Sequence, residues 1–353
     1  MSDTSAVRAG EELDLGALNA WLATNAAEAG VVTAVEQFSG GFSNLTYLLK
    51  SARGECVLRR PPAGVGKGTA HDMPREFRIL STLATHAVPA PRPVALCEDT
   101  AVLGVPFYIM ERVHGVILQR GSSETPVPDV MRRLSESFVE TLAAIHSLDA
   151  SDPAIAALGK AEGYVERQVS GWTKRWEASR TDDVPAMERV AQWLASNQPA
   201  SSGACLVHND YKYDNLVLDP ADFSRVVAVL DWEMATLGDP LLDLGTTLGY
   251  WVEAGDHPAL RSLGLGVTAL PGNFTRAELW EHYLARTGRP AVDPAFYYAF
   301  GLFKIAVIAQ QIYYRYRKGF TKDERFAAMI HGTKALARQG ARAIDRDRIS
   351  RLA

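Results

Sequence analysis

The sequence has only three cysteines and no long uninterrupted run of apolar residues. Cys56, Cys97 and Cys205 are scattered and lack the spacing of a metal site, so we expect reduced thiols in a cytoplasmic protein. No apolar run approaches the ~18 residues of a membrane span. Residues 1–16 lack the basic-then-apolar order of a signal peptide. We therefore expect neither secretion nor a membrane partner.

A strong net charge is also absent. The formal net charge of -4 and the pI near 6.1 give no support for a nucleic-acid partner. The charges are nevertheless unevenly placed, because residues 1–249 carry 21 Lys and Arg against 32 Asp and Glu, whereas residues 250–353 carry 16 against 9. The C-terminal third is therefore basic, with a net charge of +7.

The first 112 residues alternate short apolar runs with turn residues, which predicts a small antiparallel sheet. A helix is expected over residues 11–29, and a second from Asp72, with Pro74 in its first turn, to about Ala84. The Pro- and Gly-rich residues 61–69 predict a loop. The expected strands are residues 31–38, 45–49, 56–58, 94–98 and 107–112.

From about Val127 onward, apolar residues recur at helical spacing. Two short apolar runs, 216–218 and 226–230, flank a turn and predict a hairpin. The fold class is therefore α+β, with a small sheet lobe over residues 1–112 that holds one main helix and a larger, mostly helical lobe over 113–353. The helices expected in the larger lobe are residues 130–148, 163–179, 276–287, 294–317 and 323–342.

Residues 206–239 carry the pattern with the clearest chemistry. They place His208, Asp210 and Asn215 on one short loop, and Asp231 at the end of an apolar strand. Phosphoryl transfer needs a carboxylate that orients the attacking hydroxyl, and hard oxygen ligands that hold Mg²⁺ on the phosphates. We assign Asp210 as the catalytic base, and Asn215 and Asp231 as magnesium ligands. Any one of them alone could simply cap a turn.

Six segments along the chain form a common set of motifs: GGFSNLTYLL (40–49), CVLRRPP (56–62), PREFRIL (74–80), FYIMERVHG (107–115), LVHNDYKYDN (206–215) and VLDWEMATLGDPLLDLG (229–245). Together they resemble the aminoglycoside phosphotransferase-like branch of the protein-kinase-like fold. The resemblance is strongest to the N-terminal kinase-like domains of acyl-CoA dehydrogenase family members ten and eleven. It implies two lobes, an ATP substrate and Mg²⁺.

The resemblance also implies a nucleotide site in the first lobe. Arg59 stands where the wider fold has Lys and would pair with Glu76, leaving Arg60 to point away; the exact phosphate contact of an Arg stays open. The phosphate-covering hairpin would be Ser39, Gly40, Gly41, Phe42, Ser43 and Asn44. The hinge that contacts adenine would include Met110, Glu111 and Val113, although Met110 could equally fill the core.

The same resemblance suggests supporting roles near the loop. His208 is expected to hold the loop through hydrogen bonds rather than act as a base. Asp243 is expected to anchor loop amides, and Asp239 to do similar work. Lys212 could touch the transferred phosphate or be solvated.

We expect an ATP- and Mg²⁺-dependent phosphotransferase whose small-molecule acceptor is an anionic hydroxy acid or hydroxyacyl-CoA. The basic C-terminal third, with YYRYRKGFTKDER at 313–325, favours an anion, although this stretch could be only a solvated helix face. The alternatives are an antibiotic phosphotransferase and a nucleotide-binding pseudokinase. A protein kinase is disfavoured because no D-F-G and A-P-E segment follows Asp231. The choice of ATP over GTP and the formation of a homodimer stay open.

Overall fold

The computed structural model describes residues 3–38, 44–62, 71–122, 126–321 and 323–352. Its contacts divide the chain into two compact units. The first unit contains Met1–Gly115 together with Val227–Ala235, and the second contains Val116–Val226 and Thr236–Ala353. The sequence analysis placed residues 227–235 with the C-terminal lobe, whereas the structure groups them with the first unit.

Hydrogen bonds explain why this distant segment belongs to the first unit. The backbone N–H of Val229 donates to the carbonyl oxygen of Pro89 over 2.8 Å. The guanidinium of Arg75 donates to the carbonyl oxygen of Glu233 over 3.1 Å. Because these partners lie about 140 or more residues apart, no local sequence signal could have revealed the pairing.

The first unit is built on a six-stranded antiparallel sheet with the order β1-β2-β3-β4-β6-β5. The strands expected from the sequence are present with small shifts at their ends. Strand β1 was not expected, because two residues carry no periodicity. The strands are β1 (Thr4–Ser5), β2 (Val32–Phe38), β3 (Leu45–Ser51), β4 (Gly54–Arg60), β5 (Pro93–Cys97) and β6 (Phe107–Glu111).

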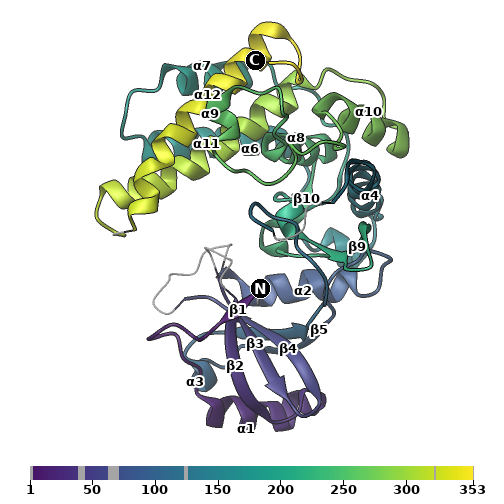
Figure 1. Ribbon diagram of the computed structural model, residues 1–353, viewed down its shortest axis with the longest axis vertical. Helices are drawn as coiled ribbons and strands as arrows, with labels where there is room; N and C mark the ends of the chain where they lie inside the picture. Colours follow the sequence, from purple (N-terminus) through teal and green to yellow (C-terminus); the bar gives the residue numbers. More distant parts are fainter. Residues whose placement is uncertain (1–2, 39–43, 63–70, 123–125, 322, 353) are drawn as a thin grey trace. The chain divides into compact units, whose positions relative to one another are not determined.

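Helices α1 (Leu15–Asn25) and α2 (Met73–Leu83) cover opposite faces of this sheet (Figure 1). Helix α1 packs into a core that includes Phe107 of β6. Residue Tyr108 points to the other face because side chains alternate along a strand, and its ring lies 6.1 Å from that of Phe77 in α2. A short helix, α3 (Thr100–Leu103), follows β5.

The starts of α1 and α2 follow from their capping residues. Asp14 accepts a hydrogen bond from the N–H of Ala17 over 3.0 Å, so α1 begins four residues later than the sequence suggested. Its expected last turn is a separate 3₁₀ turn, η1 (Ala27–Ala29). Asp72 caps α2 in the same way, as the sequence predicted.

The second unit is mostly helical, with two small strand pairs. Strand β7 (Cys205–Val207) pairs with β10 (Thr236–Gly238), and β8 (Leu216–Asp219) forms the expected hairpin with β9 (Asp222–Val229). The last three residues of β9 are grouped with the first unit. Helix α7 was not expected, and α12 starts later than expected because the 3₁₀ turn η5 (Glu324–Ala328) precedes it. The helices are α4 (Pro128–His146), α5 (Pro153–Ala156), α6 (Tyr164–Ser179), α7 (Pro185–Ser196), α8 (Pro240–Tyr250), α9 (Pro258–Arg261), α10 (Arg276–Thr287), α11 (Ala295–Arg317) and α12 (Met329–Arg346).

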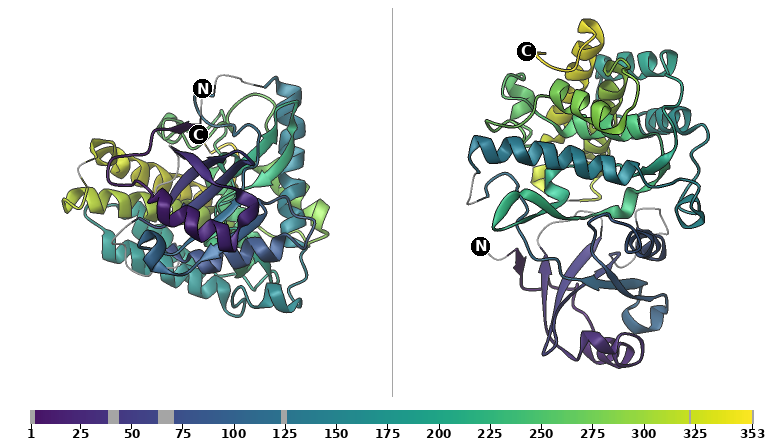
Figure 2. Two further views of the ribbon diagram at one scale, coloured as in Figure 1. Left: turned by 90° about the horizontal axis from the view of Figure 1, so that it is seen from below. Right: turned by 90° about the vertical axis from the view of Figure 1, so that its right-hand side faces the viewer.

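Helix α11 is the central helix of the second unit and runs beside α12 (Figures 1 and 2). It packs closely on α8, because a Cβ atom on Gly301 would lie only 2.0 Å from the carbonyl oxygen of Gly245. By length and composition α11 could cross a membrane, but 78% of its apolar stretch is buried inside the structure. That burial is the pattern of a core helix.

Candidate active site

The loop between β7 and β8 brings Asp210 and Asn215 together. The side-chain amide of Asn215 donates to the carbonyl oxygen of Asp210 over 2.8 Å and to its carboxylate Oδ2 over 3.0 Å. The 3₁₀ turn η3 (Tyr213–Asn215) makes this return possible within five residues. The amide nitrogen of Asn215 therefore faces Asp210.

Lys212 contacts the same carboxylate oxygen. Its Nζ lies 2.8 Å from Oδ2 of Asp210 and 4.6 Å from the ring centre of Tyr250. The sequence had left Lys212 as either a phosphate contact or a solvated residue; in the structure it is an ion-pair partner of Asp210. Both contacts fall on Oδ2 and therefore fix the plane of the carboxylate.

Asp243 of α8 anchors the backbone amides of the loop, as predicted. Its Oδ2 accepts the N–H of His208 and its Oδ1 accepts the N–H of Asn209, each over 2.7 Å. His146 of α4 adds a contact from Nε2 to Oδ2 over 3.1 Å. Burial would raise the pKa of the Asp243 carboxyl, but His146 and the loop amides outweigh it and hold the pKa below its ordinary value.

His208 supports the loop through hydrogen bonds, as expected. Its side chain is fully buried, and its Nδ1 accepts the backbone N–H of Asp210 over 3.2 Å. Asp239 does different work from that expected, because it caps α8 through the N–H groups of Leu241 and Leu242. It also accepts the N–H of Ser202 over 2.6 Å, and so fixes the chain before β7 rather than the loop itself.

In the first unit, Arg59 lies among three carboxylates. Its Nε is 3.2 Å from Glu76, and its Nη2 is 2.6 Å from Asp231 and 2.9 Å from Glu233. The Arg59–Glu76 pair was predicted. Arg60 points to the other face, as predicted, and donates to the hydroxyl of Tyr47 over 3.1 Å.

Burial and charge act on this cluster in opposite directions. Burial disfavours the charged guanidinium, yet Glu76 and Asp231 outweigh it and raise the pKa of Arg59 well above its ordinary value. Burial raises the pKa of Glu76 despite the adjacent Arg59. The cluster therefore keeps Arg59 charged and oriented.

Glu233 is a functional candidate that the sequence analysis missed. Its Oε2 accepts from Arg59 over 2.9 Å and from the side-chain amide of Asn44 over 2.9 Å. Asn44 in turn contacts Nδ1 of His71 over 2.9 Å. The sequence signal for this role was the spacing Asp231-x-Glu233. The 3₁₀ turn η4 (Trp232–Met234) brings both carboxylates to Arg59.

Asp231 itself has a left-handed backbone, with φ of 66°. Few residues other than glycine adopt this conformation, and such strain concentrates at functional positions. The side chain of Asp231 is one-third exposed, in contrast to the buried Glu76. The turn therefore presents an accessible carboxylate oxygen beside Arg59.

The other predicted nucleotide contacts are only partly described. Ser39, Gly40, Gly41, Phe42 and Ser43 lie outside the described residues. Asn44 is described, and its side-chain amide donates a hydrogen bond to Glu233.

The expected hinge follows β6. Met110 pairs with Val57 and Pro93 within the sheet, and Glu111 accepts the N–H of Arg92 over 2.9 Å. Met110 and Glu111 are only partly buried, as is Val113 just beyond the strand. Contact with adenine therefore stays a prediction for Met110, Glu111 and Val113.

Both predicted magnesium ligands carry oxygen donors, which are the ligands that Mg²⁺ prefers. Asn215, in the second unit, has an amide oxygen, and Asp231, in the first unit, has a carboxylate. Within the described parts of the chain, no group of three or more His, Cys, Asp and Glu residues could hold a metal ion. Binding of Mg²⁺ by Asn215 and by Asp231 therefore stays a prediction.

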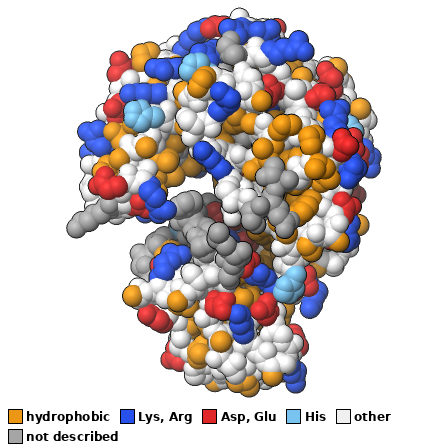
Figure 3. All heavy atoms as spheres, in the orientation of Figure 1, with side chains coloured by type: hydrophobic (Ala, Val, Ile, Leu, Met, Phe, Trp, Pro, Cys, Tyr) orange, Lys and Arg blue, Asp and Glu red, His pale blue; other side chains and the backbone are white. Residues whose placement is uncertain are grey.

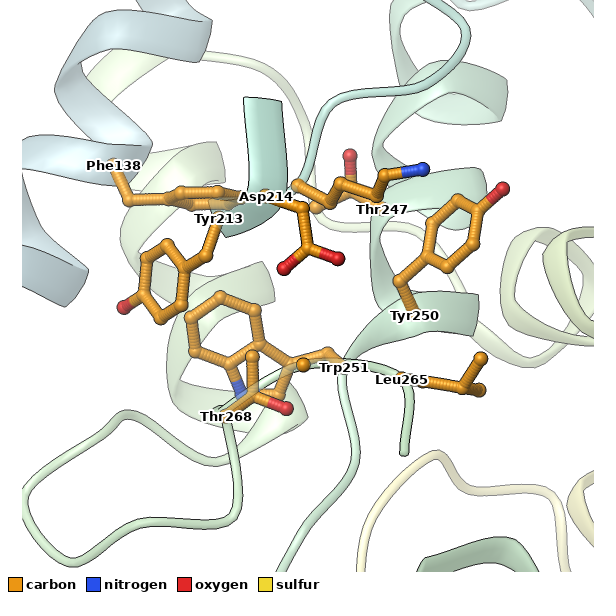
Figure 4. Close-up of a pocket in the computed structure, with 10 residues that line it drawn as sticks. Phe138, Tyr213, Asp214, Thr247, Tyr250, Trp251, Leu265 and Thr268 are labelled. Atoms are coloured by element: carbon orange, nitrogen blue, oxygen red, sulfur yellow. The ribbon is translucent and has the colours of Figure 1, made fainter. Parts of the chain in front are cut away.

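A small pocket lies directly beside the loop (Figure 4). It is lined by loop residues, by the end of α8, by Phe138 of α4 and by residues of the segment 265–268. In Figure 4 the carboxylate of Asp214 points into the middle of the group, with Tyr250 and Trp251 around it. Burial raises the pKa of Asp214. None of the lining residues comes from the basic stretch 313–325.

Comparison with known proteins gives matches over most of the chain. A model described as the phosphotransferase enzyme family matches residues 34–293. Acyl-CoA dehydrogenase family member 10 of Mus musculus is 39% identical over 282 residues, covering 79% of this chain and 26% of that protein. Acyl-CoA dehydrogenase family member 11 of Rattus norvegicus is 35% identical over 348 residues, covering 96% and 44%. The chain spans less than half the length of these two curated relatives.

Solved structures show the same likeness. A protein from Ralstonia eutropha JMP134, provisionally named an aminoglycoside phosphotransferase, has a TM-score of 0.80 and 32% identity, covering 95% of this chain and 99% of that one. A thermostable mutant of aminoglycoside phosphotransferase APH(4)-Ia, in a ternary complex with AMP-PNP and hygromycin B, has a TM-score of 0.59 and 19% identity, covering 92% and 99%. The second likeness concerns the fold alone.

Proposed function

Because the chain belongs to the phosphotransferase enzyme family and has its kinase-like α+β fold, as the motifs indicated, we propose that it transfers the γ-phosphate of ATP to a hydroxyl group of a small molecule. The observation that carries this proposal is the loop geometry around Asp210. Lys212 and Asn215 fix its carboxylate, and Asp243 fixes the backbone before it. A carboxylate held in this way is what orientation of a hydroxyl nucleophile requires.

In the proposed reaction, Asp210 accepts the hydrogen bond of the attacking hydroxyl. The hydroxyl oxygen forms a bond to the γ-phosphorus while the bond to the bridging oxygen breaks, ADP leaves, and the proton passes to Asp210. Asn215 and Asp231 are the proposed Mg²⁺ ligands. When bound, Mg²⁺ neutralises charge on the phosphate oxygens.

We assign nucleotide binding to the first unit. Arg59 supplies a guanidinium that Glu76 and Glu233 hold in place. One guanidinium group can donate two parallel hydrogen bonds to two oxygens of a phosphate. The complex of APH(4)-Ia with AMP-PNP shows that this fold accommodates a nucleotide of the ATP type in that protein.

For the acceptor, we propose an anionic hydroxy acid or a hydroxyacyl-CoA. The net charge of +7 over residues 250–353 supports an anion, and Figure 3 shows Lys and Arg side chains on the second unit's visible face. At the end of α11, Arg315, Arg317 and Lys318 are exposed. The names of the two curated relatives also concern acyl-CoA chemistry.

An aminoglycoside acceptor is the second candidate. The observation that favours it is Asp214, the carboxylate directed into the pocket beside the loop. A polycationic acceptor would form an ion pair with this carboxylate. An anionic acceptor would be repelled by it, so the positive charge of Lys212 would have to offset that repulsion. The two candidates therefore predict opposite substrate preferences.

The test is a turnover screen with the purified protein. Hydroxy acids, their CoA thioesters and aminoglycosides are each incubated with ATP and Mg²⁺, and ADP formation is measured together with the mass of the phosphorylated product. We expect turnover with hydroxy acids or CoA thioesters and its loss when EDTA removes Mg²⁺. Turnover with aminoglycosides alone would refute the anionic acceptor. If none of the acceptors gives ADP or a phosphorylated product, the proposed function is refuted.

A further inference from the structure

One lysine of the second unit is buried directly beneath the catalytic loop. Lys304 lies in the middle of α11, with 1% of its surface exposed, between the buried apolar residues Phe303 and Ile305. Its Nζ donates to the main-chain carbonyl oxygen of Asn209 over 2.7 Å. Lysine is almost never fully buried without a partner, so this contact is the reason that the site tolerates the charge.

The carbonyl of Asn209 belongs to the peptide unit that also contains the N–H of Asp210. Lys304 holds the oxygen at one end of this unit, and Nδ1 of His208 accepts the N–H at the other end over 3.2 Å. A peptide unit is planar, so holding both ends fixes its rotation. Fixing the rotation of this peptide unit also fixes the direction in which the side chain of Asp210 leaves the backbone.

The conformation of Asn209 requires this support. Its φ of 67° lies in the left-handed region, which residues other than glycine seldom adopt. Three elements hold it there: Asp243 of α8 accepts its N–H over 2.7 Å, Tyr164 of α6 donates to its side-chain oxygen over 3.0 Å, and Lys304 of α11 binds its carbonyl. All of these contacts lie within the second unit.

We propose that Lys304 is a positioning residue that orients Asp210 through the Asn209 peptide unit. Its effect on turnover rests on the proposed function, whereas its effect on the loop does not. The carboxylates of Asp243 and Asp210 face the ammonium group and favour its charged form. The cations Lys212 and Arg175 disfavour that charged form. The ring of Trp172 in α6 lies 5.7 Å from Nζ.

The charge of Lys304 supports this role. Burial lowers the pKa of Lys304 to about 8, although Asp243 and Asp210 act in the opposite direction. The ammonium is therefore charged at neutral pH and is a strong donor to the Asn209 carbonyl. It loses that charge as the pH rises through about 8, which weakens the bond.

The test compares Lys304→Met with a control on the same helix, Gln310→Met. Gln310 is also fully buried and donates to the carbonyl oxygen of Ser179 over 2.7 Å, away from the loop. Because burial of the ammonium is itself unfavourable, Met at position 304 is expected to fold. Tyr164→Phe is a second variant that removes a different contact with Asn209.

In Lys304→Met we expect hydrogen–deuterium exchange of the amides of residues 208–210 to become faster. Turnover of ATP with the best acceptor should fall about 10- to 100-fold in kcat, with KM for ATP changed less than about twofold, since a misplaced reacting group costs rate rather than nucleotide affinity. The decline of wild-type kcat above pH 8 should be missing in the variant. Tyr164→Phe should shift exchange in the same direction, and Gln310→Met should leave both readouts as in the wild type.

The outcomes separate this inference from the proposed function. A wild-type protein with no phosphoryl transfer refutes the proposed function, and the exchange measurement then decides alone whether Lys304 holds the loop. Exchange at residues 208–210 that is unchanged in Lys304→Met, or changed equally in Gln310→Met, refutes the inference. Unchanged kcat together with faster exchange refutes the claim that this contact orients Asp210.

Discussion

Replacing Asp243 by Asn tests how firmly the loop that carries Asp210 is anchored. Asp243 accepts three hydrogen bonds, from the N–H groups of His208 and Asn209 and from His146. An amide side chain has one acceptor oxygen and directs its NH₂ group at one or more of these donors. The substitution changes few atoms, so its effect reports on hydrogen bonding and charge rather than on packing.

The magnitude follows from the number of bonds lost. At least one hydrogen bond to a charged acceptor disappears, at about 1.5–3 kcal/mol, and one buried N–H is left without its acceptor, at about 1–3 kcal/mol. We therefore expect Asp243→Asn to lower the free energy of unfolding by about 3–5 kcal/mol at pH 7. Urea denaturation measures this, with Asp345→Asn as the control. Asp345 forms an exposed pair with Arg189, and its loss should change the free energy by less than about 1 kcal/mol.

The pH dependence gives a second readout. The pKa of Asp243 is lower in the folded protein than in the unfolded chain, where it is about 3.9. Its stabilisation is therefore fully present above the unfolded pKa and is lost as the pH falls through the folded pKa. Asp243→Asn should remove this part of the acid destabilisation. A free energy of unfolding within about 1 kcal/mol of that of Asp345→Asn would refute the anchoring role.

Two further predictions concern stability in each unit. Arg59→Met should lower the free energy of unfolding of the first unit by about 3–5 kcal/mol, because it leaves the buried carboxylate of Glu76 without its guanidinium; in urea denaturation, adding Glu76→Gln should recover part of the loss. Gly301→Ala should lower the melting temperature, since the added methyl group would meet the carbonyl of Gly245 at 2.0 Å and force α8 from α11. Gly332→Ala is the helical control: its methyl group has ordinary contacts, so melting should stay unchanged or rise slightly.

Much of this architecture could be predicted because its signals are local. Asp72 and Pro74 mark the start of α2 within one helical turn. Strand alternation requires that Arg59 and Arg60 point to opposite faces, which the structure confirms. The loop pattern that places Asp210 beside Asn215 is likewise contained in six residues.

The remaining features depend on contacts between distant residues. Glu233 reaches Arg59 across 174 positions, and Lys304 reaches Asn209 across 95. No periodicity encodes such pairs. A signal did exist for Lys304, a single cation in the otherwise apolar residues 295–307, but it does not name the partner. The acceptor stays a prediction for a related reason: charge along residues 313–325 does not show which residues contact an acceptor, and none of the residues that line the pocket beside the loop comes from that stretch.

The central claim is that Asp210 carries the phosphoryl transfer, and Asp210→Asn tests it most directly. The assay measures kcat for ADP formation with ATP, Mg²⁺ and the best acceptor, alongside nucleotide affinity and the free energy of unfolding. Loss of a general base predicts a fall of about 10²- to 10⁴-fold in kcat with nucleotide affinity retained. Turnover that persists at the wild-type rate in a folded, nucleotide-binding Asp210→Asn protein would contradict the account.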